Sequence, residues 1–182
     1  MPSSYVTSVP GVIHLLGLHP PANLVDVGPG YGKDGLMVME YFHPLVLDAV
    51  EVLTGRLPTQ DAVYERVVEA DARLLPEVFW EDYDTVLLID VIEHMPLEDG
   101  HELLWRMQRA GARVVVSTPK VFEEQHDDRN PHEEHVCVWS WEDFQPHGIE
   151  ADESTIDSII YLIPPLPDPA FSPELVEVDG AS

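Results

Sequence analysis

Short apolar runs rich in β-branched residues recur along the chain, and polar stretches with helical spacing separate them. Runs of this kind, bounded by glycine, proline or acidic residues, are typical of buried strands. We therefore predict strands at 23–27, 45–52, 67–71, 84–90 and 113–119. Apolar residues that recur every three or four positions predict helices at 32–42, 59–67 and 97–110.

The order of these elements predicts an α/β fold. Near-continuous apolar strands that alternate with helices form a parallel sheet covered on both faces. We expect one such domain over residues 1–163, in which 149–155 and 157–163 close the sheet as a final pair of strands. Residues 164–182 are too rich in proline to join a central strand, so we expect an extended C-terminal tail.

Charge and composition exclude several kinds of partner. The 182 residues include 34 acidic and 9 basic side chains, a net charge of −25, and such a surface repels nucleic acid. A saline cytoplasm favours this bias because salt screens the self-repulsion, and an arginine-rich genome gives a similar bias. No run is long enough to span a membrane, no secretion signal is visible, and Cys137 is the only cysteine. We expect a cytoplasmic protein without a membrane partner.

Glycines crowd the stretch LVDVGPGYGKDG, where the first predicted strand ends. Gly30, Gly32 and Gly35 have the G-x-G-x-x-G spacing of dinucleotide-binding turns, a pattern that is weak by itself. Asp26 before the turn and Asp34 after it make a poor seat for a pyrophosphate, which binds where positive charge gathers. They suit a ligand with an ammonium and a sulfonium, such as S-adenosylmethionine (SAM).

Acidic residues also end the next three predicted strands. Glu51, Asp71 and Asp90 follow the second, third and fourth apolar runs. Parallel strands end at one edge of a sheet, so we expect these carboxylates to share one crevice. Glu51 can accept bonds from two ribose hydroxyls, Asp71 from an adenine amino group, and Asp90 would lie beside the reactive methyl.

Four stretches, VDVGPGYG, DAVEV, EADAR and YDTVLLIDVIEHMPLEDG, together resemble the class I SAM-dependent methyltransferases over about residues 20–145. GPGYGKDG, VSTPK and DRNPHEEHVCVWSWEDF are further similar to a group of small bacterial, archaeal and viral methyltransferases with an N-P-x-E-x-H motif. The resemblance implies a Rossmann-like, doubly wound, mostly parallel seven-stranded sheet with an antiparallel final strand. It implies SAM as cofactor and a cofactor site at Asp26, Gly28, Gly30, Gly32, Glu51, Asp71 and Asp90, to which the neighbouring Tyr31, Ala72 and Val91 are added.

Methyl transfer is an in-line displacement at a cationic methyl, and alignment of the reactants supplies roughly 7–11 kcal/mol of the rate enhancement. A hydroxyl acceptor must also lose its proton, and histidine suits that role near neutral pH. The candidate bases are His94, His132 and His135, with Glu93 and Glu134 as partners that orient them.

The polar segment 120–141 is expected to be ordered and to roof the pocket, because long loops in small domains are usually functional or disordered. It contains many metal-ligating side chains but no strict ligand spacing, so we expect no metal there; these residues are His126, Asp127, Asp128, His132, Glu133 and His135. Trp139 and Trp141 alternate and are expected to share one face of a strand.

The function expected from these features is transfer of a methyl group from SAM to a small-molecule or sugar-containing acceptor. Two alternatives stay open. An NAD-dependent oxidoreductase would use the same kind of glycine turn, and the relative affinities for SAM and NAD separate the two. A non-catalytic protein of the same fold would bind a protein partner through its tail, and a partner required for turnover would support that alternative.

Overall fold

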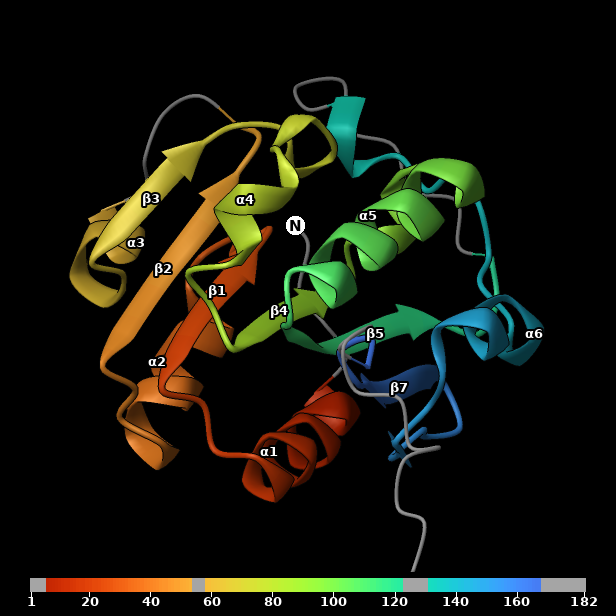
Figure 1. Cartoon of the computed structure of the whole chain (residues 1–182), viewed down its shortest axis with the longest axis horizontal. Helices are drawn as coiled ribbons and strands as arrows, with labels where there is room; N and C mark the ends of the chain where they lie inside the picture. Colours follow the sequence, from red (N-terminus) through yellow and green to blue (C-terminus); the bar gives the residue numbers. More distant parts are fainter. Residues whose placement is uncertain (1–5, 54–57, 123–130, 168–182) are drawn as a thin grey trace, which may run out of the picture.

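The computed structural model describes residues 6–53, 58–122 and 131–167 (Figure 1). Seven strands form one sheet in the order β3-β2-β1-β4-β5-β7-β6. Strands β1 to β5 pair in parallel, whereas β7 is antiparallel to β5 and β6 is antiparallel to β7. The predicted α/β class, the mostly parallel seven-stranded sheet and its antiparallel final strand are confirmed.

The elements have the following bounds. The strands are β1 (Asn23–Val27), β2 (Val46–Glu51), β3 (Arg66–Glu69), β4 (Thr85–Ile89), β5 (Arg113–Pro119), β6 (Ala151–Asp152) and β7 (Ser158–Ile163). The α-helices are α1 (Val9–Leu18), α2 (Lys33–Tyr41), α3 (Pro58–Val63), α4 (Glu77–Trp80), α5 (Leu97–Arg109) and α6 (Trp141–Phe144). Short 3-10 turns are η1 (Val6–Ser8), η2 (Ala72–Leu74), η3 (Ile92–His94), η4 (Pro131–Glu133) and η5 (Gln145–His147).

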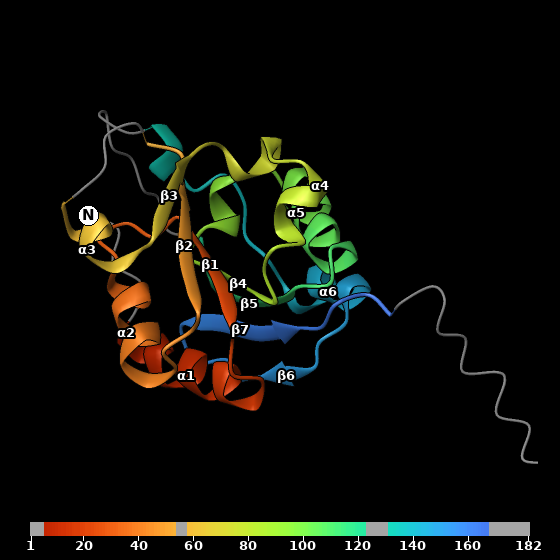
Figure 2. The same cartoon turned by 60° about the vertical axis from the view of Figure 1, so that its left-hand side comes forward.

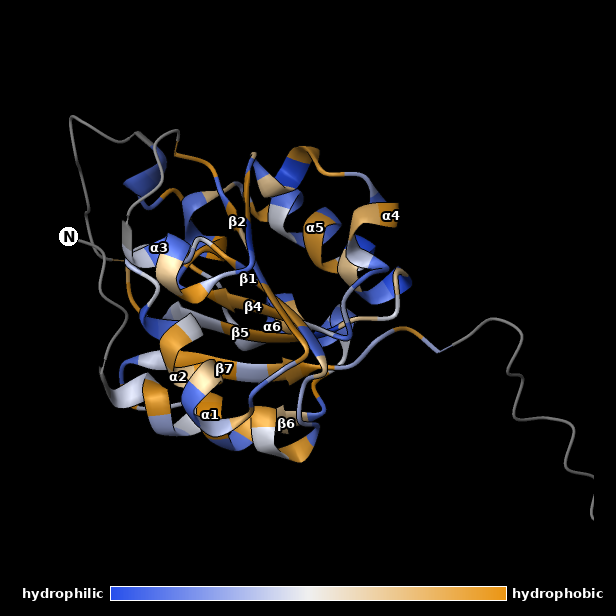
Figure 3. Cartoon of the chain, turned by 90° about the vertical axis from the view of Figure 1, so that its left-hand side faces the viewer, coloured by the Kyte–Doolittle hydropathy of each residue, from blue (hydrophilic) through white to orange (hydrophobic). Residues whose placement is uncertain are grey.

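Helices cover both faces of the sheet, so its central strands are buried on both sides (Figure 2). Successive side chains of a strand point to opposite faces. Val25 and Val27 of β1 therefore join the core under α4, α5 and α6, while Leu24 joins the core under α1 and α2. The result is the mostly hydrophobic character of β4 and β5 that Figure 3 shows.

Helices α1 and α3 and strand β6 are among the elements that differ from the sequence prediction. Helix α3 ends at Val63, before the predicted end at 67, and β6 keeps only two residues of the predicted strand 149–155. Helix α1 was not predicted, because one proline and two glycines interrupt its sequence VPGVIHLLGL. Gly11 serves packing there: a Cβ on it would lie 3.0 Å from the Cβ of Glu153.

The prediction that Trp139 and Trp141 share a strand face is wrong. Ser140 lies between them and starts α6 in a capping box with Asp143, in which each side chain bonds to the other residue's backbone. The chain therefore turns between the two tryptophans. Trp139 is buried in the core at 1% exposure, whereas Trp141 is 52% exposed.

No helix in the described part of the chain is long and apolar enough to cross a membrane. Of the predicted tail, residues 164–167 are described, and 168–182 lie outside the described residues. The start of the tail is bound to α5. The Gln108 side chain donates to the Pro164 carbonyl at 2.8 Å, and the Leu166 amide donates to the Gln108 carbonyl at 3.1 Å.

Candidate active site

The carboxyl ends of the parallel strands meet at one edge of the sheet, where the predicted site residues gather. In Figure 1 the arrowheads of β2 and β3 point to this edge, and the short turn η4 lies beside them. Helix N-termini and loops that follow parallel strands form ligand sites at this position in α/β folds.

The glycine turn between β1 and α2 requires glycine for two separate reasons. Gly28, Gly30 and Gly32 have φ values of 69°, 51° and 79°, in the left-handed region that other residues rarely adopt. A Cβ on Gly28 would also lie 2.7 Å from Cγ2 of Val91, the residue that starts the loop after β4. Part of the glycine pattern therefore serves close packing between two strand ends. The side chain of Tyr31, within the same turn, is 52% exposed.

Asp26 is a buried acid beneath this turn. It is 1% exposed, and its Oδ2 accepts a hydrogen bond of 2.5 Å from the hydroxyl of Tyr64. Burial and then the nearby Asp34 raise the pKa of Asp26 well above its usual range, and Glu51 adds to the effect. The raised pKa favours the uncharged form of Asp26, and a cation bound nearby would favour its charged form.

Glu51 ends β2 and is tied to the glycine turn by the backbone. Its Oε1 accepts a bond of 3.1 Å from the Leu53 amide, and the amides of Val52 and Gly30 also bond to the carboxylate. These bonds lower the pKa of Glu51, but burial outweighs them and raises it. The carboxylate is 9% exposed and held in a fixed orientation at the strand end.

The acids of this edge repel one another. Asp34, at the start of α2, has its pKa raised first by burial and then by Asp90, although Lys33 opposes the shift. Asp26, Asp34, Glu51 and Asp90 therefore form one electrostatically coupled group around the glycine turn. Such a group attracts a cation and repels a phosphate.

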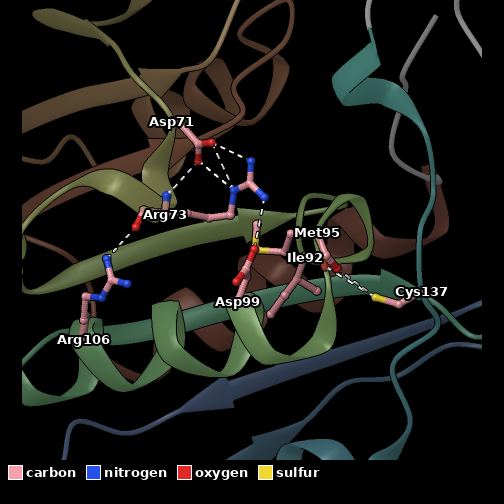
Figure 4. Close-up of polar contacts among 7 residues, drawn as sticks. All are labelled: Asp71, Arg73, Ile92, Met95, Asp99, Arg106 and Cys137. Atoms are coloured by element: carbon pink, nitrogen blue, oxygen red, sulfur yellow. Dashed lines mark hydrogen bonds and ion pairs between the residues drawn. The ribbon is translucent and has the colours of Figure 1, made fainter.

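Asp71 follows β3 and is engaged by an arginine (Figure 4). Both of its carboxylate oxygens accept bonds from the Arg73 guanidinium at 2.6 to 3.1 Å, and Oδ1 also accepts the Arg73 amide. These bonds lower the pKa of Asp71. Arg73 also donates to the carboxylate of Asp99 on α5. Ala72, at the start of η2, is buried. Beside them lies a pocket of about 440 Å³ lined by Asp71, Arg73, Leu74, Asp99, Glu102 and Arg106.

Asp90 leaves β4 with an unusual backbone conformation. Its φ is 52°, which is costly for a residue with a side chain, and such strain collects at functional sites. Bonds to β5 hold it in place: its amide donates to the Ser117 carbonyl at 2.9 Å, and the Ser117 hydroxyl donates to its Oδ1 at 3.2 Å. The strained residue turns the chain from β4 into η3.

Turn η3 places Glu93 and His94 next to His135. Glu93 is 2% exposed, and burial, together with Asp90, raises its pKa to about 8. The His94 and His135 rings meet edge to face with 4.7 Å between centroids, and burial lowers the pKa of His94. The Val136 amide donates to the Glu93 carbonyl at 2.9 Å, which fixes the His135 segment against η3.

His132 does not belong to this group. Its side chain is exposed, and its electrostatic effect lowers the pKa of Asp71, which lies at the other end of the site. The charge of Glu133 acts to raise the pKa values of both Glu51 and His94, so Glu133 lies near both residues. Residues 132–135 therefore lie over the edge from η2 to η3. The remainder of the predicted roof, 123–130, lies outside the described residues, and so do His126, Asp127 and Asp128.

No protein-family model matches the chain, and neither does any curated protein. Solved structures do share its fold. A 1,6-didemethyltoxoflavin-N1-methyltransferase from Burkholderia thailandensis, with bound 1,6-didemethyltoxoflavin and S-adenosylhomocysteine (SAH), superposes with a TM-score of 0.67 at 15% identity; the match covers 88% of this chain and 78% of that chain. The N-terminal domain of EvdMO1, in the presence of SAH and D-fucose, gives 0.62 at 15% identity, over 90% of this chain and 84% of that one.

A longer structure is similar over part of its length. An O-methyltransferase family protein from Burkholderia thailandensis has a TM-score of 0.57 at 15% identity, over 86% of this chain, and the chain spans about half of that protein (55%). Likeness at this level of identity concerns the fold alone. Together with the strand order 3-2-1-4-5-7-6, it identifies the fold as the Rossmann-like fold of class I methyltransferases.

Proposed function

We propose that the protein is a SAM-dependent methyltransferase whose acceptor is a small molecule or carries a sugar. The supporting observation is the group of buried and half-buried, mutually repelling carboxylates around the glycine turn. A ligand with a sulfonium and an ammonium relieves that repulsion. The pyrophosphate of NAD would add two negative charges to it, which argues against an oxidoreductase.

The proposed cofactor site has its parts along the strand ends. The turn with Gly28, Gly30 and Gly32 would lie along the methionine portion, covered by Tyr31. Glu51 would accept the ribose hydroxyls. Because Arg73 already occupies both oxygens of Asp71, we propose that Asp71 positions η2 and Ala72 on the adenine side and does not carry the main adenine contact. Asp26 would act from beneath the turn by its charge, and Asp90 and Val91 would flank the methyl.

The proposed reaction needs little from the protein beyond alignment and removal of one proton. SAM supplies an electrophilic methyl on a positively charged sulfur. The acceptor oxygen would bond to that carbon from the side opposite the sulfur, while the carbon–sulfur bond would break and leave its electron pair on sulfur. His94 and His135 lie at the end of the edge beside Asp90, so we propose that they position the acceptor hydroxyl, whose proton would pass to water.

We also propose that residues 1–163 are the methyltransferase domain, with 164–182 as an appended tail. The bonds between Gln108 and residues 164–166 anchor the beginning of that tail to α5. The expected location of the protein is the cytoplasm.

Calorimetric titration of the purified chain with SAM, SAH and NAD tests the proposed function. We expect micromolar binding of SAM and SAH, one per chain, and far weaker binding of NAD. Tighter binding of NAD than of SAM would support the oxidoreductase and overturn the proposal.

A further inference from the structure

Three side chains from two distant segments converge beside the proposed methyl site. Glu93 and His94 come from η3, and His135 comes from the segment after η4. One ligand atom of each lies within 4.8 Å of the other two. We propose that Glu93, His94 and His135 bind a divalent transition-metal ion, with Zn²⁺ as the best fit to the donor set.

The carboxylate of Glu93 provides the first independent observation. The Thr118 hydroxyl donates to its Oε2 at 3.1 Å, but its Oε1 is buried and has no hydrogen-bond partner among the described residues. A buried carboxyl oxygen without a partner is costly, and buried carboxyl groups are normally paired or bound to a metal. A metal ion between the two histidines would be the missing partner.

The hydrogen bond of His94 prepares its ring for metal binding. Nδ1 lies 3.2 Å from the backbone carbonyl oxygen of Glu134, and since a carbonyl can only accept, Nδ1 carries the proton. In the neutral ring, Nε2 then holds a free lone pair. Histidines that bind metals usually donate their other ring nitrogen to a carbonyl or carboxylate in this way.

Backbone contacts fix the third ligand relative to the first. The Glu93 carbonyl accepts the amides of Val136 and Cys137 at 2.9 and 3.3 Å, directly after His135. The Trp139 indole donates to the Ile92 carbonyl at 3.2 Å and anchors the same segment in the core. The three side chains are therefore held together by the fold itself, and His135 is 8% exposed.

The donor set indicates the class of ion. Two imidazoles and one carboxylate suit Zn²⁺ and its first-row neighbours, whereas Mg²⁺ and Ca²⁺ prefer oxygen ligands. Three protein ligands leave at least one coordination position open for water or substrate. Asp90, which interacts electrostatically with both Glu93 and His94, adds negative charge beside the ion.

A consequence for the reaction rests on the proposed function. The open position would take the acceptor hydroxyl, and a metal lowers the pKa of an oxygen bound to it. The hydroxyl proton would then pass to water, and the oxygen would attack the methyl as described above. The lone pairs of His94 and His135 would hold the ion, so neither ring would act as the base.

Calorimetric titration of the chelator-stripped full chain with Zn²⁺, in physiological salt and excess Mg²⁺, tests the metal site. Excess Mg²⁺ occupies the acidic surface, so the expected result is one Zn²⁺ per chain. Glu93→Gln and His135→Ala should each weaken binding by about 10-fold or more. His14→Ala is the matched control, because it removes one member of an exposed His14–Glu153 pair whose atoms are 2.5 Å apart.

Equal Zn²⁺ binding by the wild type and both site variants would overturn the proposal, since the ions would then lie on the acidic surface. Far-UV circular dichroism verifies folding of each variant. Visible absorption of the Co²⁺ form gives a second readout, and the wild-type bands should be lost in Glu93→Gln. SAM binding is measured on the same metal-free samples: SAM binding without Zn²⁺ binding refutes the metal site alone, and Zn²⁺ binding without SAM binding refutes the proposed function alone.

Discussion

Removal of the Glu51 carboxylate should weaken cofactor binding far more than it changes the fold. The carboxylate is 9% exposed at the end of β2, and one of its oxygens receives the Leu53 amide. The amides of Leu53, Val52 and Gly30 take three of the roughly four acceptor sites of the carboxylate, which leaves at least one for a ribose hydroxyl. Hydrogen bonds to charged groups contribute about 1.5–3 kcal/mol. Glu51→Ala should therefore raise the Kd for SAH by roughly 10- to 150-fold.

Titration calorimetry with SAH on the wild type and three variants measures this effect. Glu40→Ala is the control, because it removes the same charge from an exposed position on α2. Glu51 also binds the Gly30 amide, so Glu51→Gln is included: it keeps an acceptor for the backbone and loses the charge. A Kd for Glu51→Ala within twofold of the wild type, or an equal loss in Glu40→Ala, would refute the assignment of Glu51 to the ribose.

Three further predictions concern stability. Tyr64→Phe removes the 2.5 Å donor to buried Asp26 and should lower the free energy of unfolding by about 1.5–3 kcal/mol in urea titrations; an unchanged value would show that Asp26 does not depend on this bond. Burial, with a smaller effect of His101, lowers the pKa of His147 from 6.5 to about 4. As the pH falls, the His147 imidazole is therefore protonated in the unfolded chain before it is protonated in the folded protein. Stability should decrease between pH 6.5 and 4, and His147→Gln should reduce that slope; parallel curves would contradict the prediction. Finally, screening of the net charge of −25 should raise the melting temperature as potassium chloride approaches molar concentration, and a flat or falling curve would reject a role for self-repulsion.

The sequence was sufficient to predict the sheet because the relevant pattern is local. Near-continuous apolar runs such as residues 84–90 can be buried only between two layers of helices, and the acids that follow them are placed by topology alone. Glu51 and Asp90 accordingly lie at the edge where parallel strands end. The glycines around Gly28 were recognised, but their spacing does not reveal that Val91 packs against one of them.

Contacts between distant segments were beyond sequence reasoning. The sequence groups Glu93 with His94 and His135 among the candidate bases and their partners, but only the fold shows that ligand atoms of all three converge. Ligand spacing was assessed only within residues 120–141, and Glu93 lies outside that segment. One local ion pair was also not foreseen. The sequence suggests an adenine contact for Asp71, whereas in the structure the guanidinium of Arg73, two residues later, donates to both of its carboxylate oxygens.

A crystal structure of the chain with SAH bound tests the central proposal most directly. The proposal predicts SAH at the carboxyl edge of the sheet, with its ribose hydroxyls on Glu51, its amino acid portion along the turn at Gly28–Gly32, and its sulfur facing Asp90 and His94. Density for SAH in the pocket between Arg73 and Arg106, or at any place away from this edge, would contradict it.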